Sequence, residues 1–217
     1  IAVLEQWIVQ TDNVAVNGTT DNTRTRVSLS HTDHEDTYPG AKMEKTNVAF
    51  SSQHTVTDKI KIWYSGSYIR NHANGRPRTG YDSRNVSTSF NQWFQRQLDM
   101  DRLEDLYMSE SGQPQSWNIS SATNLKPAYW DNPYWIVNTS YTEDNRDRFY
   151  GNFNVSYEPV KNLLITAAAR TDYYTFNVED RIATYSLDQD YYSEIVRRGT
   201  EDNFEMMINY NGKISED

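Results

Sequence analysis

The chain has 217 residues, of which 36% are hydrophobic and 13% aromatic, leaving about 23% for the other hydrophobic side chains. That is a small supply for a conventional core, yet 16 Tyr, 6 Trp and 7 Phe argue against disorder, because disordered chains are poor in aromatic residues. The net charge of −9 disfavours a nucleic-acid partner, and the lack of Cys excludes disulfides, thiolate metal sites and Cys nucleophiles.

No apolar run approaches the roughly 18 residues that a membrane-spanning helix needs, so the sequence excludes a helical membrane protein. It does not exclude a membrane barrel, because each barrel strand is apolar on one face only and the average composition stays polar. The first residues also lack the basic segment and the small-residue cleavage site of a signal peptide.

Apolar residues recur at a spacing of two in about seven segments, and this period with one polar face predicts antiparallel strands. Several of the segments have ten or more residues. The repeating positions are Val14 and Val16, Val27 and Leu29, Val48 and Phe50, Ile60 to Tyr68, Phe149 to Tyr157, Leu163 to Tyr173, and Phe204 to Tyr210.

The links between the predicted strands alternate in length. Short links are expected at 17–22, 57–59, 158–162 and 211–213, and long polar links at about 35–44, 71–147 and 179–200. Short turns at one end of an up-and-down sheet and long loops at the other are typical of outer-membrane barrels. Seven strands cannot close such a barrel and would leave two pairing edges, so we expect a fragment of a larger sheet.

The long link between the two groups of strands should contain structure of its own. Helical spacing of Phe90, Trp93, Phe94 and Leu98, followed by Leu103, Leu106 and Tyr107, predicts one or two short amphipathic helices there. The following stretch, 117–135, is rich in Asn, Ser, Pro and aromatic residues and is interpreted as an irregular, packed surface loop.

Four segments, in the same order, resemble the SusC/RagA-like TonB-linked outer-membrane transporters. They are Asn74-Gly-Arg-Pro-Arg-Thr-Gly-Tyr81 with Phe90-Asn-Gln-Trp-Phe-Gln-Arg-Gln-Leu-Asp-Met100, Asp131-Asn-Pro-Tyr-Trp135, Glu143-Asp-Asn-Arg-Asp-Arg148 with Gly151-Asn152, and the tail Ile214-Ser-Glu-Asp217. The resemblance covers about residues 13–217. Residues 1–10 match the family poorly, and residues 1–12 have no assigned role.

The resemblance implies an all-β fold: part of a 22-stranded transmembrane β-barrel, with strands at about 13–72 and 147–211 and a helix-containing extracellular loop at about 73–146. It implies a Gram-negative outer membrane, import of oligosaccharides or peptides, and a SusD-like surface lipoprotein as partner. TonB would act through a plug region that cannot be located in this chain, so energy coupling is assigned to none of its residues. No enzymatic activity and no cofactor are implied.

The loop aromatics Trp117, Tyr129, Trp130, Tyr134 and Trp135 are the candidate ligand-binding residues. Flat aromatic rings fit the C–H face of a sugar, and neighbouring Asn and Asp side chains can bond its hydroxyl groups. The alternative is that these rings pack the loop against itself and the barrel rim. Likewise, Phe90, Trp93 and Phe94 are expected on the buried face of a loop helix.

Other patterns carry less information. In His31-Thr-Asp-His34-Glu-Asp36, a strand turns His31 and His34 to opposite faces, so a polar strand tip is favoured over a metal site. Pairs such as Asp99 with Asp101 lack the remaining residues of a calcium loop. No nucleophile elbow or ordered catalytic triad supports a secreted hydrolase.

Two hypotheses therefore remain. In the first, lipid-facing apolar residues form a transporter wall, with Tyr64, Tyr68, Tyr157 and Tyr173 in aromatic girdles at the interfaces with water. Its lumen-facing polar residues would include Lys61, Asn152, Asn154, Arg170 and Asp172. In the second, the chain is a soluble all-β carbohydrate-binding module, in which the same apolar faces pair across a sandwich core.

Overall fold

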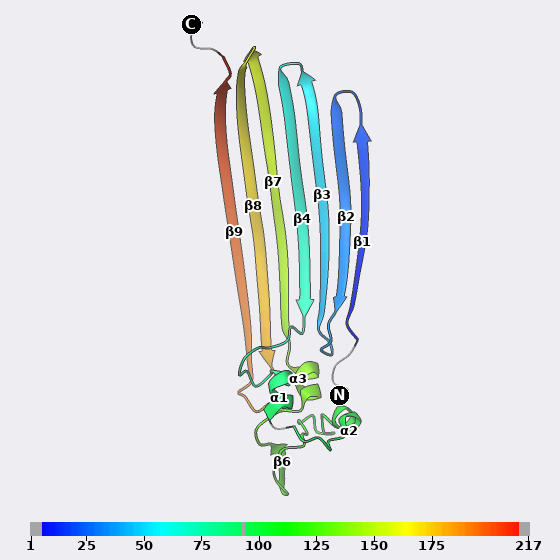
Figure 1. The fold of residues 1–217 in the computed structure, drawn as a ribbon. Helices are drawn as coiled ribbons and strands as arrows, with labels where there is room; N and C mark the ends of the chain where they lie inside the picture. The colour runs from blue at the N-terminus through cyan, green and yellow to red at the C-terminus, as the bar shows by residue number, and fades with distance from the viewer. Residues whose placement is uncertain (1–5, 93, 213–217) are drawn as a thin grey trace.

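A computed structural model describes residues 6–92 and 94–212 of the chain. Its main feature is one seven-stranded antiparallel sheet in the order β1-β2-β3-β4-β7-β8-β9, shown in Figure 1. Each strand pairs with its neighbour along the chain, and β4 pairs with β7 across the long loop. The strands are β1 Ile8–Thr19, β2 Thr23–Glu35, β3 Lys42–Thr57, β4 Ile60–Asn74, β7 Thr142–Val160, β8 Leu163–Ile182 and β9 Tyr191–Tyr210.

The prediction of seven antiparallel strands in up-and-down order is confirmed. The sheet starts near Ile8 rather than at 13 and resumes at Thr142 rather than at 147. Tight turns at 20–22, 58–59 and 161–162 lie at one end of the sheet, which we call the turn end. The links 36–41, 75–141 and 183–190 lie at the other, the loop end (Figure 1).

The expected long link at 179–200 is wrong in length, because it contains only residues 183–190. The flanking residues continue the ladder between β8 and β9, with Glu179 opposite Glu194 and Ile182 opposite Tyr191. In the end of β8, Phe176, Val178 and Ile182 still recur at a spacing of two, but they lie on the opposite face from Tyr173, so the run predicted from Leu163 to Tyr173 does not continue in phase. The link 36–41 is likewise shorter than the expected 35–44.

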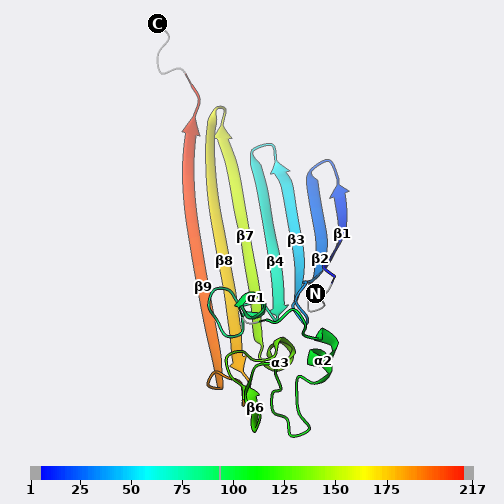
Figure 2. The same cartoon turned by 60° about the horizontal axis from the view of Figure 1, so that its bottom comes forward.

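The long link 75–141 folds into a compact cap at the loop end, which Figure 2 brings forward. It contains helices α1 Val86–Gln92, α2 Met100–Asp105 and α3 Pro133–Thr139, and a hairpin of β5 Ile119–Ser121 and β6 Asn124–Pro127. Short helices were predicted near α1 and α2. However, Phe94 follows the end of α1, and Trp93 lies outside the described residues, as does the tail 214–217.

Helix α3 and the hairpin correct the interpretation of 117–135 as irregular. Asn132 caps α3, since its side-chain oxygen accepts a hydrogen bond from the Tyr134 backbone N–H over 2.9 Å, and Pro133 occupies the first helical position. Both features favour the start of a helix. The seven residues of α3 are too few for a helical period to show in the sequence.

The buried apolar core lies in the cap rather than on the sheet. Val86, Tyr134 and Ile136 form its centre, with Leu103 and Tyr107 packed against them. No second sheet covers the large sheet within the described residues, where the other sheet is the β5–β6 hairpin. Most large apolar side chains of the strands are therefore exposed. None of the described helices is long and apolar enough to cross a membrane.

Candidate functional site

The two faces of the large sheet differ in chemistry. Alternate residues of each strand share a face, and the register carries each face across all seven strands. One face, here called the apolar face, carries Phe149, Phe153 and Tyr157 of β7. The opposite face, the polar face, carries Asn152 and Arg170, which are cross-strand partners.

The apolar face bears a band with aromatic residues at both ends. At the loop-end side, Tyr68, Phe149 and Tyr173 form one cross-strand row. At the turn-end side, Tyr157 lies opposite Ile60 and Ile165. The rise of a strand places the two rows about 26 Å apart along β7. Beyond the first row the same face becomes polar.

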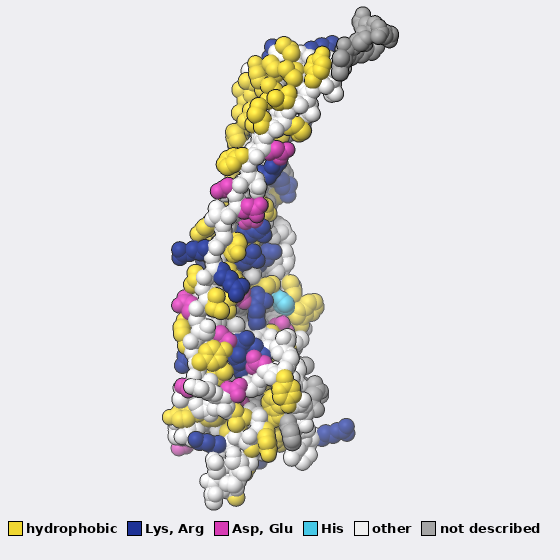
Figure 3. Space-filling view, turned by 90° about the vertical axis from the view of Figure 1, so that its left-hand side faces the viewer, with side chains coloured by type: hydrophobic (Ala, Val, Ile, Leu, Met, Phe, Trp, Pro, Cys, Tyr) yellow, Lys and Arg dark blue, Asp and Glu magenta, His cyan; other side chains and the backbone are white. Residues whose placement is uncertain are grey.

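Figure 3 shows this change from the β9 side, with hydrophobic side chains gathered near the turn end and charged side chains nearer the loops. The expected girdle residues Tyr64, Tyr68, Tyr157 and Tyr173 all share the apolar face. Tyr64, however, lies opposite Phe153, midway between the two rows, so its expected place in a girdle is wrong.

Within the depth of the band, the polar face carries paired charges and amides. Arg148 forms an ion pair with Asp172, and Arg170 Nη1 lies 2.8 Å from Glu205 Oε2. Asn152 donates from its side chain to Ser65 Oγ over 2.6 Å. All five residues predicted to be lumen-facing share this face, and they are Lys61, Asn152, Asn154, Arg170 and Asp172.

A network of arginines and acids fastens the cap to the strand ends. The carboxylate of Asp180, near the end of β8, forms ion pairs with Arg78 and Arg84 of the cap and accepts hydrogen bonds from Thr142 and Tyr191. Burial alone would raise the pKa of Asp180. The hydrogen bonds from Arg84, Tyr191 and Arg78 outweigh burial and hold this pKa well below its usual range.

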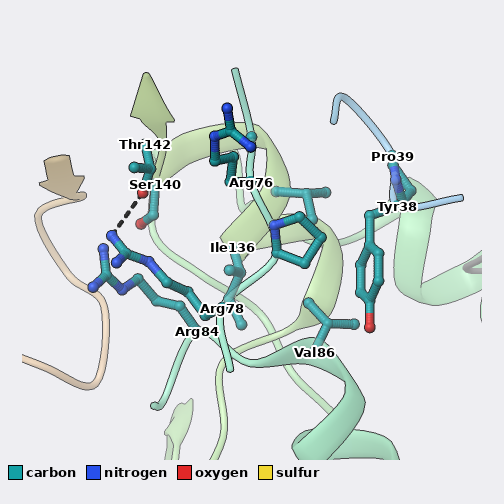
Figure 4. A pocket seen from close by; sticks show the side chains of 12 residues that line it. Tyr38, Pro39, Arg76, Arg78, Arg84, Val86, Ile136, Ser140 and Thr142 are labelled. Carbon is teal, nitrogen blue, oxygen red and sulfur yellow. Dashed lines mark hydrogen bonds between the residues drawn. The ribbon is translucent and has the colours of Figure 1, made fainter. Parts of the chain in front are cut away.

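Figure 4 shows the seam between the cap and the strands, where Arg78 and Arg84 lie beside Ser140 and Thr142. Tyr38 and Val86 lie on the other side, and Ile136 lies between the two groups. The hollow has a volume of about 40 Å³, which is far below the roughly 300 Å³ of ordinary ligand pockets. It can take a few water molecules but neither a sugar nor a peptide. The seam therefore fastens the loop and is not a binding pocket.

The structure separates the five candidate loop aromatics into two groups. Trp130, Tyr134 and Trp135 are buried, with exposed fractions of 5%, 4% and 3%. Tyr129, in contrast, is 66% exposed, and Trp117 is half-buried and makes an edge contact with Phe94 at 5.5 Å between ring centroids. Their role in ligand binding stays a prediction, and Tyr129 and Trp117 are the two that solvent can reach.

Trp117 lines an open hollow of about 350 Å³ between α2 and the segment 115–117. Trp130 and Trp135 have structural partners instead. Trp130 packs on Tyr81 with ring centroids 6.1 Å apart, and Trp135 Nε1 donates to Ser186 Oγ over 2.9 Å. These two rings hold the cap together, which leaves Trp117 as the candidate with space for a ligand beside it.

Asp131 is a buried acid within the cap. It is 5% exposed, one carboxylate oxygen accepts a hydrogen bond from the Leu187 backbone N–H over 3.0 Å, and the other has no partner among the described residues. Burial raises the pKa of Asp131 to about 6; the Leu187 hydrogen bond opposes the rise, and nearby Asp188 adds to it. The group therefore titrates close to neutral pH.

The two histidines of the segment 31–36 lie on opposite faces of β2. His31 Nε2 lies 3.2 Å from Asp33 Oδ1 on one face, whereas His34 on the other face accepts a hydrogen bond from Trp7. The part of the chain that the structure describes holds no group of three or more potential metal ligands.

Sequence reasoning missed the Asp180 network. Its only sequence signal was that Arg76 and Arg78 belong to the segment Asn74–Tyr81, which resembles the transporter family.

Comparison with solved structures finds the same fold in transport proteins. Two matches are chains of the RagAB peptide importer, in its closed-closed and open-open states, with TM-scores of 0.66 and 0.65 at 13% and 14% sequence identity. Each alignment covers 96% of this chain and 22% of the importer chain. No family model matches the sequence, and no curated protein matches it.

Proposed function

We propose that the chain forms part of the wall of an outer-membrane transporter of the SusC/RagA kind, with its apolar face toward lipid and its polar face toward the lumen. The observation that carries this proposal is the band between the rows of Tyr68 and Tyr157. Its depth of about 26 Å matches the apolar band of about 25 Å in outer-membrane barrels, and its aromatic rows match their girdles. The fold shared with the RagAB importer chains supports it.

In this proposal the seven strands are neighbours in a closed 22-stranded barrel, and β1 and β9 pair with strands outside this chain. Both edge strands are long and lack a second partner among the described residues, an arrangement that soluble proteins avoid because it invites aggregation. The turn end faces the periplasm, and the cap lies on the extracellular side. The wall performs no chemistry on its substrate, which is an oligosaccharide or a peptide.

A SusD-like lipoprotein is the proposed partner at the extracellular mouth, and TonB would supply energy through a plug. The solved neighbours bear the name of a two-part assembly, RagAB, which supports a partner of this kind. The carbohydrate-binding module is less favoured. A sandwich would cover the apolar face with a second sheet, and within the described residues no such sheet lies over it.

Two adjacent methionines test the proposal. Met206 lies on the apolar face opposite Ala167, and Met207 lies on the polar face opposite Thr166. In the complete encoded chain, expressed in a Gram-negative host, Met206→Arg places a charge in lipid at a cost of about 2 kcal/mol or more, whereas a lumenal Arg costs little. Met206→Arg should therefore reduce the inserted, heat-modifiable protein several-fold, and Met207→Arg should leave it near the wild-type level. Equal effects, or a larger effect of Met207→Arg, would refute the proposed orientation.

A further inference from the structure

Three cations without acidic partners lie in one cross-strand row of the polar face. The register places Lys45, Asn71, Arg146, Phe176 and Arg197 opposite one another in succession on β3, β4, β7, β8 and β9. We call the three cations the cation row. Neighbouring strands are about 4.8 Å apart, so each cation backbone lies about 10 Å from the next. The row is nearer the loop end than the Tyr68–Phe149–Tyr173 row is.

The cation row differs from the other arginines of this region because its members have no ion pair with any described residue. Of the nearby acids on the polar face, Asp172 pairs with Arg148 and Asp144 pairs with Arg76. Glu201, opposite Asp172, accepts a hydrogen bond from Asn203 and has no ion pair with a described residue. In a chain with a net charge of −9, this stretch of the polar face is locally positive. An unpaired row of positive charge on a lumenal wall attracts anions.

Arg146 is positioned by an aromatic ring rather than by an acid. Its guanidinium carbon lies 5.2 Å from the centroid of the Tyr174 ring, a favourable cation–π arrangement. Tyr174 lies opposite Gly199 on β9, and any side chain at Gly199 would collide with the ring. The absence of a side chain at Gly199 thus leaves room for the Tyr174 ring. The ring positions the Arg146 guanidinium and leaves its N–H donors available to a ligand.

Asn71 adds an acceptor in the middle of the row. Its side-chain oxygen is buried and has no hydrogen-bond partner among the described residues. Buried polar atoms generally have partners, and a rotation of the Asn71 side chain that brings this oxygen to the surface of the polar face would let it accept from the N–H group of a bound molecule. Phe176, between Arg146 and Arg197, adds an apolar surface. The cation row, Asn71 and Phe176 together suit a ligand that has carboxylates, an N–H donor and an apolar part.

We infer that the cation row, with Asn71 and Phe176, binds acidic peptides on their way through the barrel. A peptide with two acidic side chains supplies carboxylates to Arg146 and Arg197, and its backbone supplies N–H donors. This inference rests on the proposed function, because it takes the polar face to be the lumen. The inference goes beyond the proposed function because it selects peptides over oligosaccharides, and acidic peptides over neutral ones.

The test uses the complete encoded chain purified in detergent and titrated calorimetrically with three probes. They are a pentapeptide with two glutamates, the same peptide with glutamines, and a galacturonate oligosaccharide. The glutamate peptide should bind at least tenfold more tightly than either other probe, because charge-assisted hydrogen bonds are about twice as strong as neutral ones. Its affinity should fall as NaCl is raised from 0.05 to 0.5 M, because salt screens exposed charges.

Adjacent arginines supply a matched control. Arg197 lies on the polar face, and Arg198 lies on the apolar face opposite Thr175. Arg197→Gln should weaken binding of the glutamate peptide about tenfold, and Arg198→Gln should leave it unchanged. Gly199→Ala, which displaces Tyr174, should weaken binding as Arg146→Gln does. Circular dichroism and heat-modifiable mobility verify that each variant is folded.

Equal affinity for the glutamate and glutamine peptides would overturn the inference, as would equal losses for Arg197→Gln and Arg198→Gln. Tighter binding of the galacturonate probe would overturn the choice of peptides. Membrane insertion is measured separately with the Met206 and Met207 variants. If the peptide experiment fails while the insertion experiment gives the expected result, the acidic-peptide site is refuted. The proposal of a transporter wall is then unaffected.

Discussion

Arg84 Nη1 lies 2.7 Å from Asp180 Oδ1, which joins the cap to the end of β8 across 96 positions of the sequence. The same guanidinium bonds Asp82 within the cap. Arg84 is therefore shared between the loop and the strand, and its side chain is largely buried, with 11% exposed. Burial alone would lower the pKa of Arg84, and the bonds to Asp180 and Asp82 raise it above its usual value. This pair fastens the long loop to the sheet, together with the ion pairs of Arg78 with Asp180 and of Arg76 with Asp144.

Removing Arg84 should release the cap without unfolding the sheet. Arg84→Ala removes one cationic partner of the Asp180 carboxylate, which keeps Arg78 and Tyr191, at a cost of about 1.5 to 3 kcal/mol. Hydrogen exchange should accelerate in 75–92 and 183–190, while the ladder between β7 and β8 stays protected.

Arg170→Ala is the control for this prediction. It breaks the exposed Arg170–Glu205 pair and should cost less than about 1 kcal/mol. Equal exchange in the two variants would show that Arg84 does not anchor the cap.

The attachment should also weaken in acid. The pKa of Asp180 is depressed in the folded chain, so its stabilising contribution is complete above the unfolded value near 4 and is lost as the pH falls below it. Thermal unfolding of the cap should show this loss when it is monitored by limited proteolysis at pH values between 5 and 3. Asp180→Asn should remove the dependence over this range, and a persisting dependence would assign it to other carboxylates.

The pH dependence of cap stability that comes from Asp131 should have the opposite sign to that from Asp180. Its pKa of about 6 in the folded chain exceeds the unfolded value near 4, so the folded chain holds the extra proton between these values. Stability of the cap therefore falls as the pH rises from about 4 to 6, by up to about 3 kcal/mol in total.

Asp131→Asn keeps an acceptor for the Leu187 N–H and carries no charge. At pH 7.5 this variant should raise the temperature at which half of the cap is cleaved (the midpoint). It should also remove the fall in cap stability between pH 4 and 6. The exposed Asp105→Asn should do neither. A lower midpoint for Asp131→Asn would mean that the charged form is favoured by a group outside the described residues.

The sheet could be predicted from the sequence because its signal is local. In β7, Phe149, Phe153 and Tyr157 alternate with polar residues and reveal the strand directly. The end of β8 was missed because its apolar residues change face: Phe176 and Val178 lie on the opposite face from Tyr173, and Asp180 interrupts their alternation before Ile182.

The attachments of the cap are invisible in the sequence for another reason. The structural role of Asp180 depends on its ion pairs with Arg78 and Arg84, which are 102 and 96 positions away in the sequence. The cation row likewise depends on a register across β3, β7 and β9 that no local pattern encodes. Of the loop aromatics, sequence reasoning could name the residues but not tell the buried Trp135 from the exposed Tyr129.

Asn132 should be essential to the fold of the cap. It is fully buried, its Oδ1 accepts from the Tyr134 N–H over 2.9 Å, and its Nδ2 donates to the Leu103 carbonyl over 2.8 Å. Asn132→Ala loses both bonds and should cost about 2 kcal/mol or more.

Asn132→Asp separates the two roles, because it keeps the cap of α3 and loses the donor to Leu103. If both bonds matter, Asn132→Asp should also be destabilised at pH 7.5, where its charge is buried beside a carbonyl. Protease susceptibility of the segment 99–139 measures both variants, and wild-type resistance of Asn132→Asp would limit the role of Asn132 to capping.

The loop aromatics should divide into residues that hold the cap and residues that contact substrate. Trp130→Ala and Trp135→Ala empty buried positions and should each destabilise the cap by about 3 kcal/mol or more, so lost uptake in these variants says nothing about a ligand. Tyr129→Ala and Trp117→Ala should leave protease resistance nearer that of wild type.

Growth on a defined peptide or oligosaccharide as sole nutrient then tests the prediction that Trp117 and Tyr129 bind a ligand. A ligand role predicts several-fold slower uptake by Tyr129→Ala or Trp117→Ala at wild-type surface abundance, with partial rescue by Phe at either position, because a ring restores the stacking surface. Leu106→Ala, on the rim of the hollow that Trp117 lines, is the control for a general disturbance of α2. Wild-type uptake by both aromatic variants would remove the loop aromatics from the binding site and leave the polar face of the sheet as the place where this chain contacts its substrate.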